Sequence, residues 1–116
     1  MSNLIENRSF EFAVRIVKLS RYLNEQKKEF VLSKQILRSG TSIGANVAEA
    51  QQGQSDADFI FKINIALKEA AETKYWIRLL EATDYLTAAE TESILAECIE
   101  LEKILYSIVR TSKSKQ

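Results

Sequence analysis

The residues with the greatest potential for chemistry are the glutamates and the single cysteine in the last third of the chain. Glutamates recur from Glu90 to Glu102, and Glu97 and Glu100 lie about one helical turn apart. Glutamates on the helices of a bundle can hold a di-metal centre, but such centres also use a Glu-x-x-His motif. The chain contains no histidine, which also removes the commonest general base. We therefore interpret these glutamates as a solvated acidic face and predict no metal site.

Cys98 is the remaining candidate nucleophile. It falls within an apolar seam at helical spacing, where a cysteine behaves as a small apolar side chain. The sequence contains no phosphate-binding loop, no dinucleotide-binding fingerprint and no zinc-ligand spacing. It thus predicts no catalytic residue, no cofactor and no enzymatic activity.

A stripe of polar residues beside Gly40 and Gly44 is a stronger candidate for a functional site. At helical spacing its members fall on one side of the segment, and they are Arg38, Ser42, Asn46 and Glu49. They could form a hydrated face with exposed ion pairs, each worth about 0–1 kcal/mol. They could instead face another helix or subunit and fix its register through hydrogen bonds. A ligand or nucleic-acid site is the third interpretation.

The elements that must position these residues are helices. The 116 residues include no proline and only three glycines, too little turn punctuation for a sheet protein. Apolar residues recur at helical spacing and predict helices over residues 7–26, 33–53, 56–82 and 87–110. Short connections between long helices favour antiparallel neighbours. We expect an all-α, antiparallel up-down-up-down four-helix bundle, one domain over residues 1–116 with a frayed basic tail at 111–116.

Local signals support these helix starts. Ser33, Ser55 and Thr87 are predicted N-caps, and Thr87 with Glu90 forms a capping box. Gly40 and Gly44 each cost up to about 1 kcal/mol of helix propensity relative to alanine. Close approach of a neighbouring helix would offset that cost.

Charge and hydropathy exclude several classes of protein. Lysine plus arginine equals aspartate plus glutamate, at 16 each, although residues 1–54 are mildly basic and residues 55–116 mildly acidic. A dedicated nucleic-acid binder usually has a larger basic excess. No apolar run approaches the roughly 18 residues of a membrane helix, and the N-terminus lacks the apolar core of a signal peptide. We expect a cytoplasmic protein with no membrane contact.

The predicted third helix has a second apolar side. Opposite the stripe that contains Phe59 and Ile63 lies another set, which comprises Phe61, Ile65, Trp76 and Leu79. A helix of a monomeric bundle normally presents a polar back to water, and an exposed apolar patch marks an interaction site. We interpret this set as an oligomer interface. The alternative is oblique packing within one chain that covers both sides.

The segment LRSGTSIGANVAEA at residues 37–50 resembles the signature of the bacterial 23S rRNA intervening-sequence proteins. The segments DFI at 58–60 and IALKEAAET at 65–73 extend the resemblance over nearly the whole chain. The resemblance implies a four-helix bundle that assembles into a ring-shaped homo-oligomer, a pentamer. It also implies recurrent polar residues at the positions of the polar stripe. Many members carry proline where this chain has Gly44.

Two functions follow as hypotheses. The first is a non-enzymatic, homo-oligomeric helical scaffold of undefined cellular role. The second rests on a related branch, the accessory variability determinant of diversity-generating retroelements, which binds nucleic acid and is markedly basic. An oligomer would repeat a weak basic surface and raise avidity, and the predicted contact residues are Arg8, Arg15, Lys18, Arg38, Lys113 and Lys115.

Overall fold

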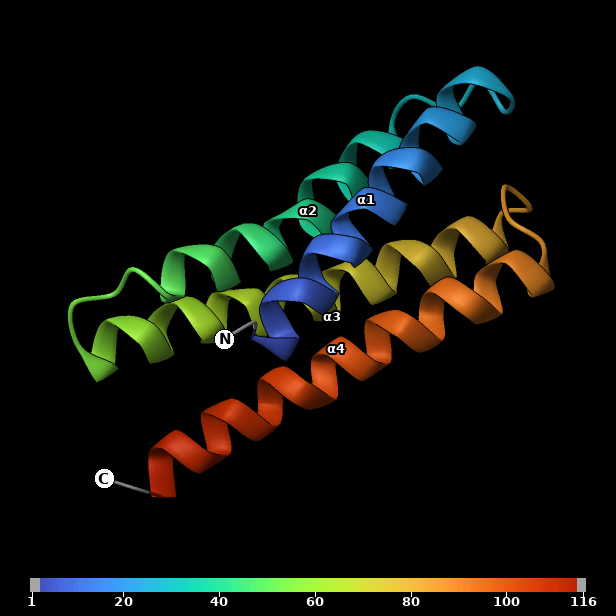
Figure 1. Cartoon of the computed structure of the whole chain (residues 1–116). Coiled ribbons are helices and arrows are strands. Elements are labelled where there is room, and N and C mark those ends of the chain that lie inside the picture. Colours follow the sequence, from blue (N-terminus) through green and yellow to red (C-terminus); the bar gives the residue numbers. More distant parts are fainter. Residues whose placement is uncertain (1–2, 115–116) are drawn as a thin grey trace.

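Four helices make up nearly all of the computed structural model, which describes residues 3–114 (Figure 1). They are α1 (Leu4–Glu25), α2 (Leu32–Ala50), α3 (Asp56–Ala82) and α4 (Ala88–Ser114). Helices that follow one another in the chain pack side by side, and α1 contacts α4 less extensively than it contacts α2. Within the described chain, α1 and α3 make no close backbone contact, and neither do α2 and α4, so these pairs lie diagonally. The predicted all-α four-helix bundle is confirmed.

The core lies along the axis of a molecule with extents of 47 × 24 × 21 Å. Each helix contributes apolar side chains three or four residues apart, the spacing that places them on one face. Fully or almost fully buried members include Phe12, Ile16, Ile36, Ile43, Ile63, Ile77, Cys98, Leu101 and Leu105.

The two glycines of α2 allow α1 to approach closely. A methyl group at Gly40 would lie 2.7 Å from Cγ1 of Ile16. A methyl group at Gly44 would lie 3.1 Å from the carbonyl oxygen of Ser9, on the α1 backbone. The close approach of a neighbouring helix, predicted from the cost of two glycines in mid-helix, is therefore present.

The start of α2 differs from the prediction. Ser33 is not the N-cap, because the helix already begins at Leu32 and the residue before it makes no side-chain cap. The carboxylate of Glu29 instead accepts hydrogen bonds from the backbone N–H groups of Leu32 at 3.0 Å and Ser33 at 2.8 Å. The Ser33 hydroxyl bonds to Oδ1 of Asn24 at 2.8 Å. The carboxylate of Glu29 therefore caps the first N–H groups of α2, and the Ser33 hydroxyl instead connects α2 to α1.

Other helix ends match or extend the expectations. Ser55 caps α3 by accepting from the N–H of Asp58, and Thr87 and Glu90 form the predicted reciprocal capping box. The α1 helix begins at Leu4, earlier than expected, because Asn3 accepts a capping hydrogen bond from the N–H of Ile5.

The α4 helix continues to Ser114, beyond the expected helix end at residue 110. Its apolar seam extends to Val109, which is 6% exposed. The frayed basic tail at 111–116 stays a prediction. Residues 115–116 lie outside the described part. None of the helices in that part is long and apolar enough to cross a membrane.

Candidate interaction surfaces

The outer side of α3 exposes aromatic residues. Of the four residues predicted for the oligomer interface, Phe61 is 64% exposed, whereas Ile65, Trp76 and Leu79 are half-buried. Tyr75, which the sequence analysis did not assign to this side, is 59% exposed. Tyr75 follows Phe61 by 14 residues, close to four helical turns, so helical spacing could have found it. We call Phe61, Lys68, Tyr75, Arg78 and Leu79 the α3 outer face.

Trp76 lies at the edge of the α3 outer face and turns toward α2. Its ring packs against the core, and its Nε1–H donates to Oε2 of Glu72 at 3.0 Å. Glu72 in turn pairs with Arg38 of α2. The Tyr75 ring meets the Trp76 ring edge-on, with 5.1 Å between centroids. The chain thus covers part of the predicted interface itself, and the most exposed rings on this side of α3 are those of Phe61 and Tyr75.

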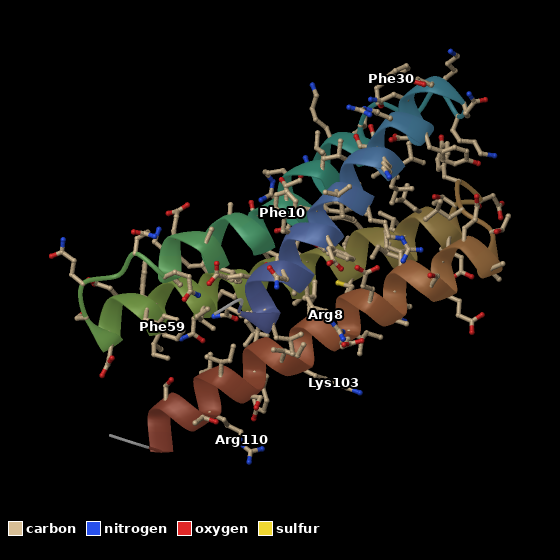
Figure 2. All side chains as sticks on the ribbon, viewed as in Figure 1. Arg8, Phe10, Phe30, Phe59, Lys103 and Arg110 are labelled. Atoms are coloured by element: carbon tan, nitrogen blue, oxygen red, sulfur yellow. The ribbon has the colours of Figure 1, made fainter. Side chains whose placement is uncertain are left out.

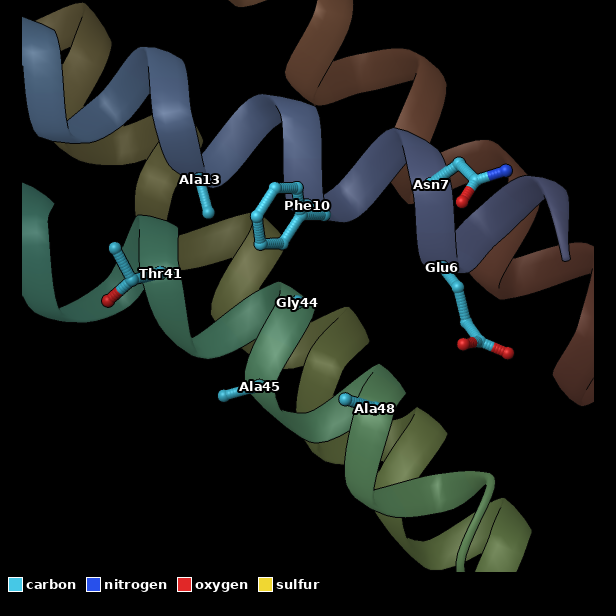
Figure 3. Close-up of a pocket in the computed structure, with 8 residues that line it drawn as sticks. All are labelled: Glu6, Asn7, Phe10, Ala13, Thr41, Gly44, Ala45 and Ala48. Atoms are coloured by element: carbon cyan, nitrogen blue, oxygen red, sulfur yellow. The ribbon is translucent and has the colours of Figure 1, made fainter. Parts of the chain in front are cut away.

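A groove between α1 and α2 forms a second apolar surface (Figure 3). Its volume is about 410 Å³, and its lining consists of Glu6, Asn7, Phe10, Ala13, Thr41, Gly44, Ala45 and Ala48. The Phe10 ring is 68% exposed and projects from α1 toward α2, where small residues leave space around it (Figures 2 and 3). The apolar periodicity of α1 did not indicate Phe10, because the periodic stripe is the buried one that contains Phe12. We call these eight residues the α1–α2 groove.

The polar stripe ties α2 to α3 at both ends. Arg38 lies 3.4 Å from Glu69 and also pairs with Glu72, and Glu49 lies 2.8 Å from Nζ of Lys62. Between them, Nδ2 of Asn46 donates to the carbonyl of Ser42 one turn earlier. Half of the Arg38 side chain and 58% of the Glu49 side chain remain exposed. The stripe residues therefore contact α3 or their own helix, and each ion pair is expected to add about 0–1 kcal/mol.

A buried hydroxyl pair lies beneath that stripe. Ser39 of α2 and Thr73 of α3 are both fully buried, and their hydroxyl oxygens are 2.9 Å apart. Thr73 also bonds to the carbonyl of Glu69 at 2.8 Å. These hydrogen bonds satisfy polar groups that would otherwise destabilise the core.

Three of the six predicted nucleic-acid contacts are already ion-paired. Arg8 pairs with Glu100 of α4, and Arg15 donates to Glu97 and Ser93 at 2.8 Å each. Arg38 pairs as described above. Lys18 is exposed, with no ion pair to the side chains that the structure describes. The side chain of Lys113 and the whole of Lys115 lie outside the described residues.

Cys98 has the surroundings of a core residue. It is fully buried, and its Sγ–H group donates to the carbonyl of Ala70 at 3.3 Å. Burial, aided by the negative charge of Glu102, raises the thiol pKa from 9.0 to about 12. A thiol with this pKa stays protonated near neutral pH and is a poor nucleophile. Within the described part, no three cysteine or carboxylate side chains are grouped to hold a metal ion.

Comparison with known proteins identifies the family. No curated protein matches the chain. A crystal structure of a protein of unknown function from the S23 ribosomal protein family of Bacteroides thetaiotaomicron VPI-5482 matches with 58% identity and a TM-score of 0.90. The match covers 91% of this chain and 98% of that one. The family model of the 23S rRNA-intervening sequence protein matches residues 2–107. The chain therefore belongs to the 23S rRNA-intervening sequence protein family, as its α2 and α3 segments predict.

Proposed function

We propose that this protein is a non-enzymatic, homo-oligomeric helical scaffold whose α3 outer face contacts another copy. The observation that carries the proposal is the exposure of Phe61 and Tyr75, at 64% and 59%, on the side of α3 away from the core. These rings lie about 21 Å apart along the helix. Exposed apolar side chains of this kind mark interaction sites, and aromatic residues are enriched in interfaces.

The absence of histidine and the burial of Cys98 support a non-enzymatic role. The polar stripe adds no free catalytic group, because Arg38 and Glu49 are paired with residues of α3. The resemblance to ring-forming relatives supports assembly into a pentamer.

Light scattering of the native chain and of Phe61→Gln/Tyr75→Gln tests the proposal. We expect a multiple of the chain mass for the native protein and a single chain for the variant, with the helical circular dichroism unchanged. Val31→Gln is the matched control, because Val31 is 71% exposed at the tip between α1 and α2. A native protein that is monomeric at cellular concentrations would end the proposal. An oligomer that dissociates in Val31→Gln but not in Phe61→Gln/Tyr75→Gln would also end it.

Trp76→Ala is a poorer probe. Trp76 packs against the core and bonds to Glu72, so its removal affects the stability of the subunit as well as any contact between copies. Phe61 and Tyr75 separate the two effects, because most of each side chain faces water.

A second candidate function is nucleic-acid binding through a basic surface of the oligomer. The supporting observation is that Lys103 and Arg110 are exposed on α4, and neither forms an ion pair with the described side chains (Figure 2). Titration with RNA and DNA at two salt concentrations tests it, since phosphate contacts weaken steeply with salt. Binding that falls with salt and falls again in Lys103→Gln/Arg110→Gln would support this candidate. An absence of binding to both polymers at low salt would remove it.

A further inference from the structure

Two apolar surfaces of the subunit point in different directions. The α1–α2 groove opens around Phe10, and the α3 outer face lies around Phe61 and Tyr75. α1 and α3 are diagonal in the bundle, and Figure 1 shows α1 in front of α3. Their solvent-facing sides therefore point away from each other. One copy cannot bring both surfaces together, but two neighbouring copies can.

The charged residue that lines the α1–α2 groove is negative. It is Glu6, which forms no ion pair with a side chain that the structure describes. The two arginines nearest in sequence, Arg8 and Arg15, turn toward α4 and pair with Glu100 and Glu97. The N-terminal half of α1 thus presents apolar and acidic groups to solvent.

The α3 outer face carries the opposite charge. Lys68 and Arg78 are exposed, and neither forms an ion pair within the described chain. Glu72, four residues after Lys68, already binds Arg38 and Trp76. The exposed surface of this part of α3 is therefore apolar and basic.

The groove also has a shape that suits an aromatic side chain. Ala13, Gly44, Ala45 and Ala48 surround Phe10 with small side chains and leave a volume of about 410 Å³ (Figure 3). A ring that entered the groove could stack against Phe10, a favourable arrangement for two aromatic residues. Aromatic rings that are available and exposed on another side of the same subunit are Phe61 and Tyr75.

We propose that the α1–α2 groove of one copy receives the α3 outer face of the next. This inference rests on the proposed homo-oligomer and adds the second contact surface. The two surfaces point away from each other, so a single two-fold contact cannot use both, and the contact is heterologous. After two copies pair, one copy retains a free α3 outer face and the other retains a free groove. Contacts of this type propagate until a ring closes, or they form a filament. A two-copy particle cannot satisfy both surfaces.

Mixing two defective chains tests this arrangement. Phe10→Gln disables the groove, and Phe61→Gln/Tyr75→Gln disables the α3 outer face. We expect each variant alone to be monomeric by native mass spectrometry. An equimolar mixture should give a particle of two chains, one of each variant, because only one intact groove and one intact α3 outer face can meet.

Three outcomes separate this inference from the proposed function. A monomeric native chain overturns both. A native oligomer that persists unchanged in Phe10→Gln overturns the inference alone, because the contact then does not use the groove. Folded monomeric variants that fail to pair in the mixture also overturn it, and circular dichroism establishes that they are folded.

Charge reversal provides a second, independent test of the contact between the groove and the α3 outer face. Glu6→Lys places a cation in the lining of the groove, and Lys68→Glu places an acid on the α3 outer face, so each change alone opposes like charges across the contact. We expect each single variant to raise the dissociation constant at least fivefold at low salt. The doubly substituted chain should return to within about twofold of the native value. A double variant whose affinity falls by the sum of the two single effects would contradict the predicted pairing of these surfaces.

Discussion

Ile16 of α1 packs directly against Gly40 of α2. A methyl group at residue 40 would approach Cγ1 and Cγ2 of Ile16 to 2.7 and 2.8 Å. Both atoms branch from the Ile16 Cβ, so they cannot swing aside as the end of a long side chain can. The contact fixes the separation of α1 and α2 at the centre of the bundle. It also explains why α2 tolerates a glycine in mid-helix.

Gly40→Ala should therefore destabilise the protein. Overpacking costs about 1–3 kcal/mol, and the gain in helix propensity returns up to about 1 kcal/mol. We expect a net loss of about 1–2 kcal/mol in the free energy of unfolding, measured by urea denaturation. In an Ile16→Ala background the same substitution should cost nothing or stabilise, because the opposing methyl groups are gone. An equal penalty in both backgrounds would contradict this account.

Glu29 should make a larger contribution to stability than its place in a loop suggests. Its carboxylate accepts from the backbone N–H groups at the start of α2, and the residue is only 8% exposed. Loss of a helix cap typically costs about 0.5–2 kcal/mol. We expect Glu29→Ala to lower the free energy of unfolding by about 1–2 kcal/mol. The exposed Glu25, changed to alanine, is the matched control and should shift stability by less than about 0.5 kcal/mol.

Helical periodicity predicts the bundle well, because the core side chains of all four helices recur every three or four residues. The seam through Ile36, Gly40, Ile43 and Val47 is buried as expected. Periodicity fails where a helix end depends on tertiary contacts. Glu29 caps α2 from the preceding loop, where Lys28 adopts a left-handed backbone conformation with φ of 53°. No spacing rule places that carboxylate against the helix start.

The interaction surfaces are predictable only in part. The sequence identifies Phe61 on the outer side of α3, but it assigns Trp76 to the same side. In the structure the N–H group of Trp76 donates to the Glu72 oxygen that also pairs with Arg38 of α2, so the indole lies on the side of α3 that faces α2. The α1–α2 groove joins two helices, so its shape depends on how closely Gly44 lets them approach. Residue spacing along a single helix therefore cannot predict a groove that forms between two helices.

The buried thiol of Cys98 should make stability depend on alkaline pH. Its pKa is about 12 in the folded protein and about 9.0 in an unfolded chain, because burial disfavours the thiolate. Below pH 9 both states keep the proton, so the contribution of the thiol to stability is complete. Above pH 9 only the unfolded state loses the proton, and stability falls by up to about 1.4 kcal/mol per pH unit until pH 12.

Urea denaturation between pH 8 and pH 10.5 checks this dependence. Cys98→Ala should lack the component of the slope that the thiol supplies, and the difference between the two proteins cancels the titration of lysines and tyrosines. Reaction of the thiol with a disulfide reagent at pH 8 should require unfolding. Rapid modification of the native protein, or identical pH slopes for both proteins, would contradict the assignment.

The hydroxyl pair of Ser39 and Thr73 should respond asymmetrically to substitution. Thr73 bonds both to Ser39 and to the carbonyl of Glu69, whereas the Ser39 hydroxyl has only Thr73 as a hydrogen-bond partner among the described residues. Thr73→Val keeps the shape but leaves the buried Ser39 hydroxyl without a bond, which costs about 1–3 kcal/mol. Ser39→Ala leaves Thr73 bonded to the carbonyl and should cost less than about 1 kcal/mol. The double variant, whose two sites are both apolar, should be more stable than Thr73→Val alone in the same urea denaturation experiment. A double variant that loses the sum of the two single effects would show that the hydroxyls do not act as a pair.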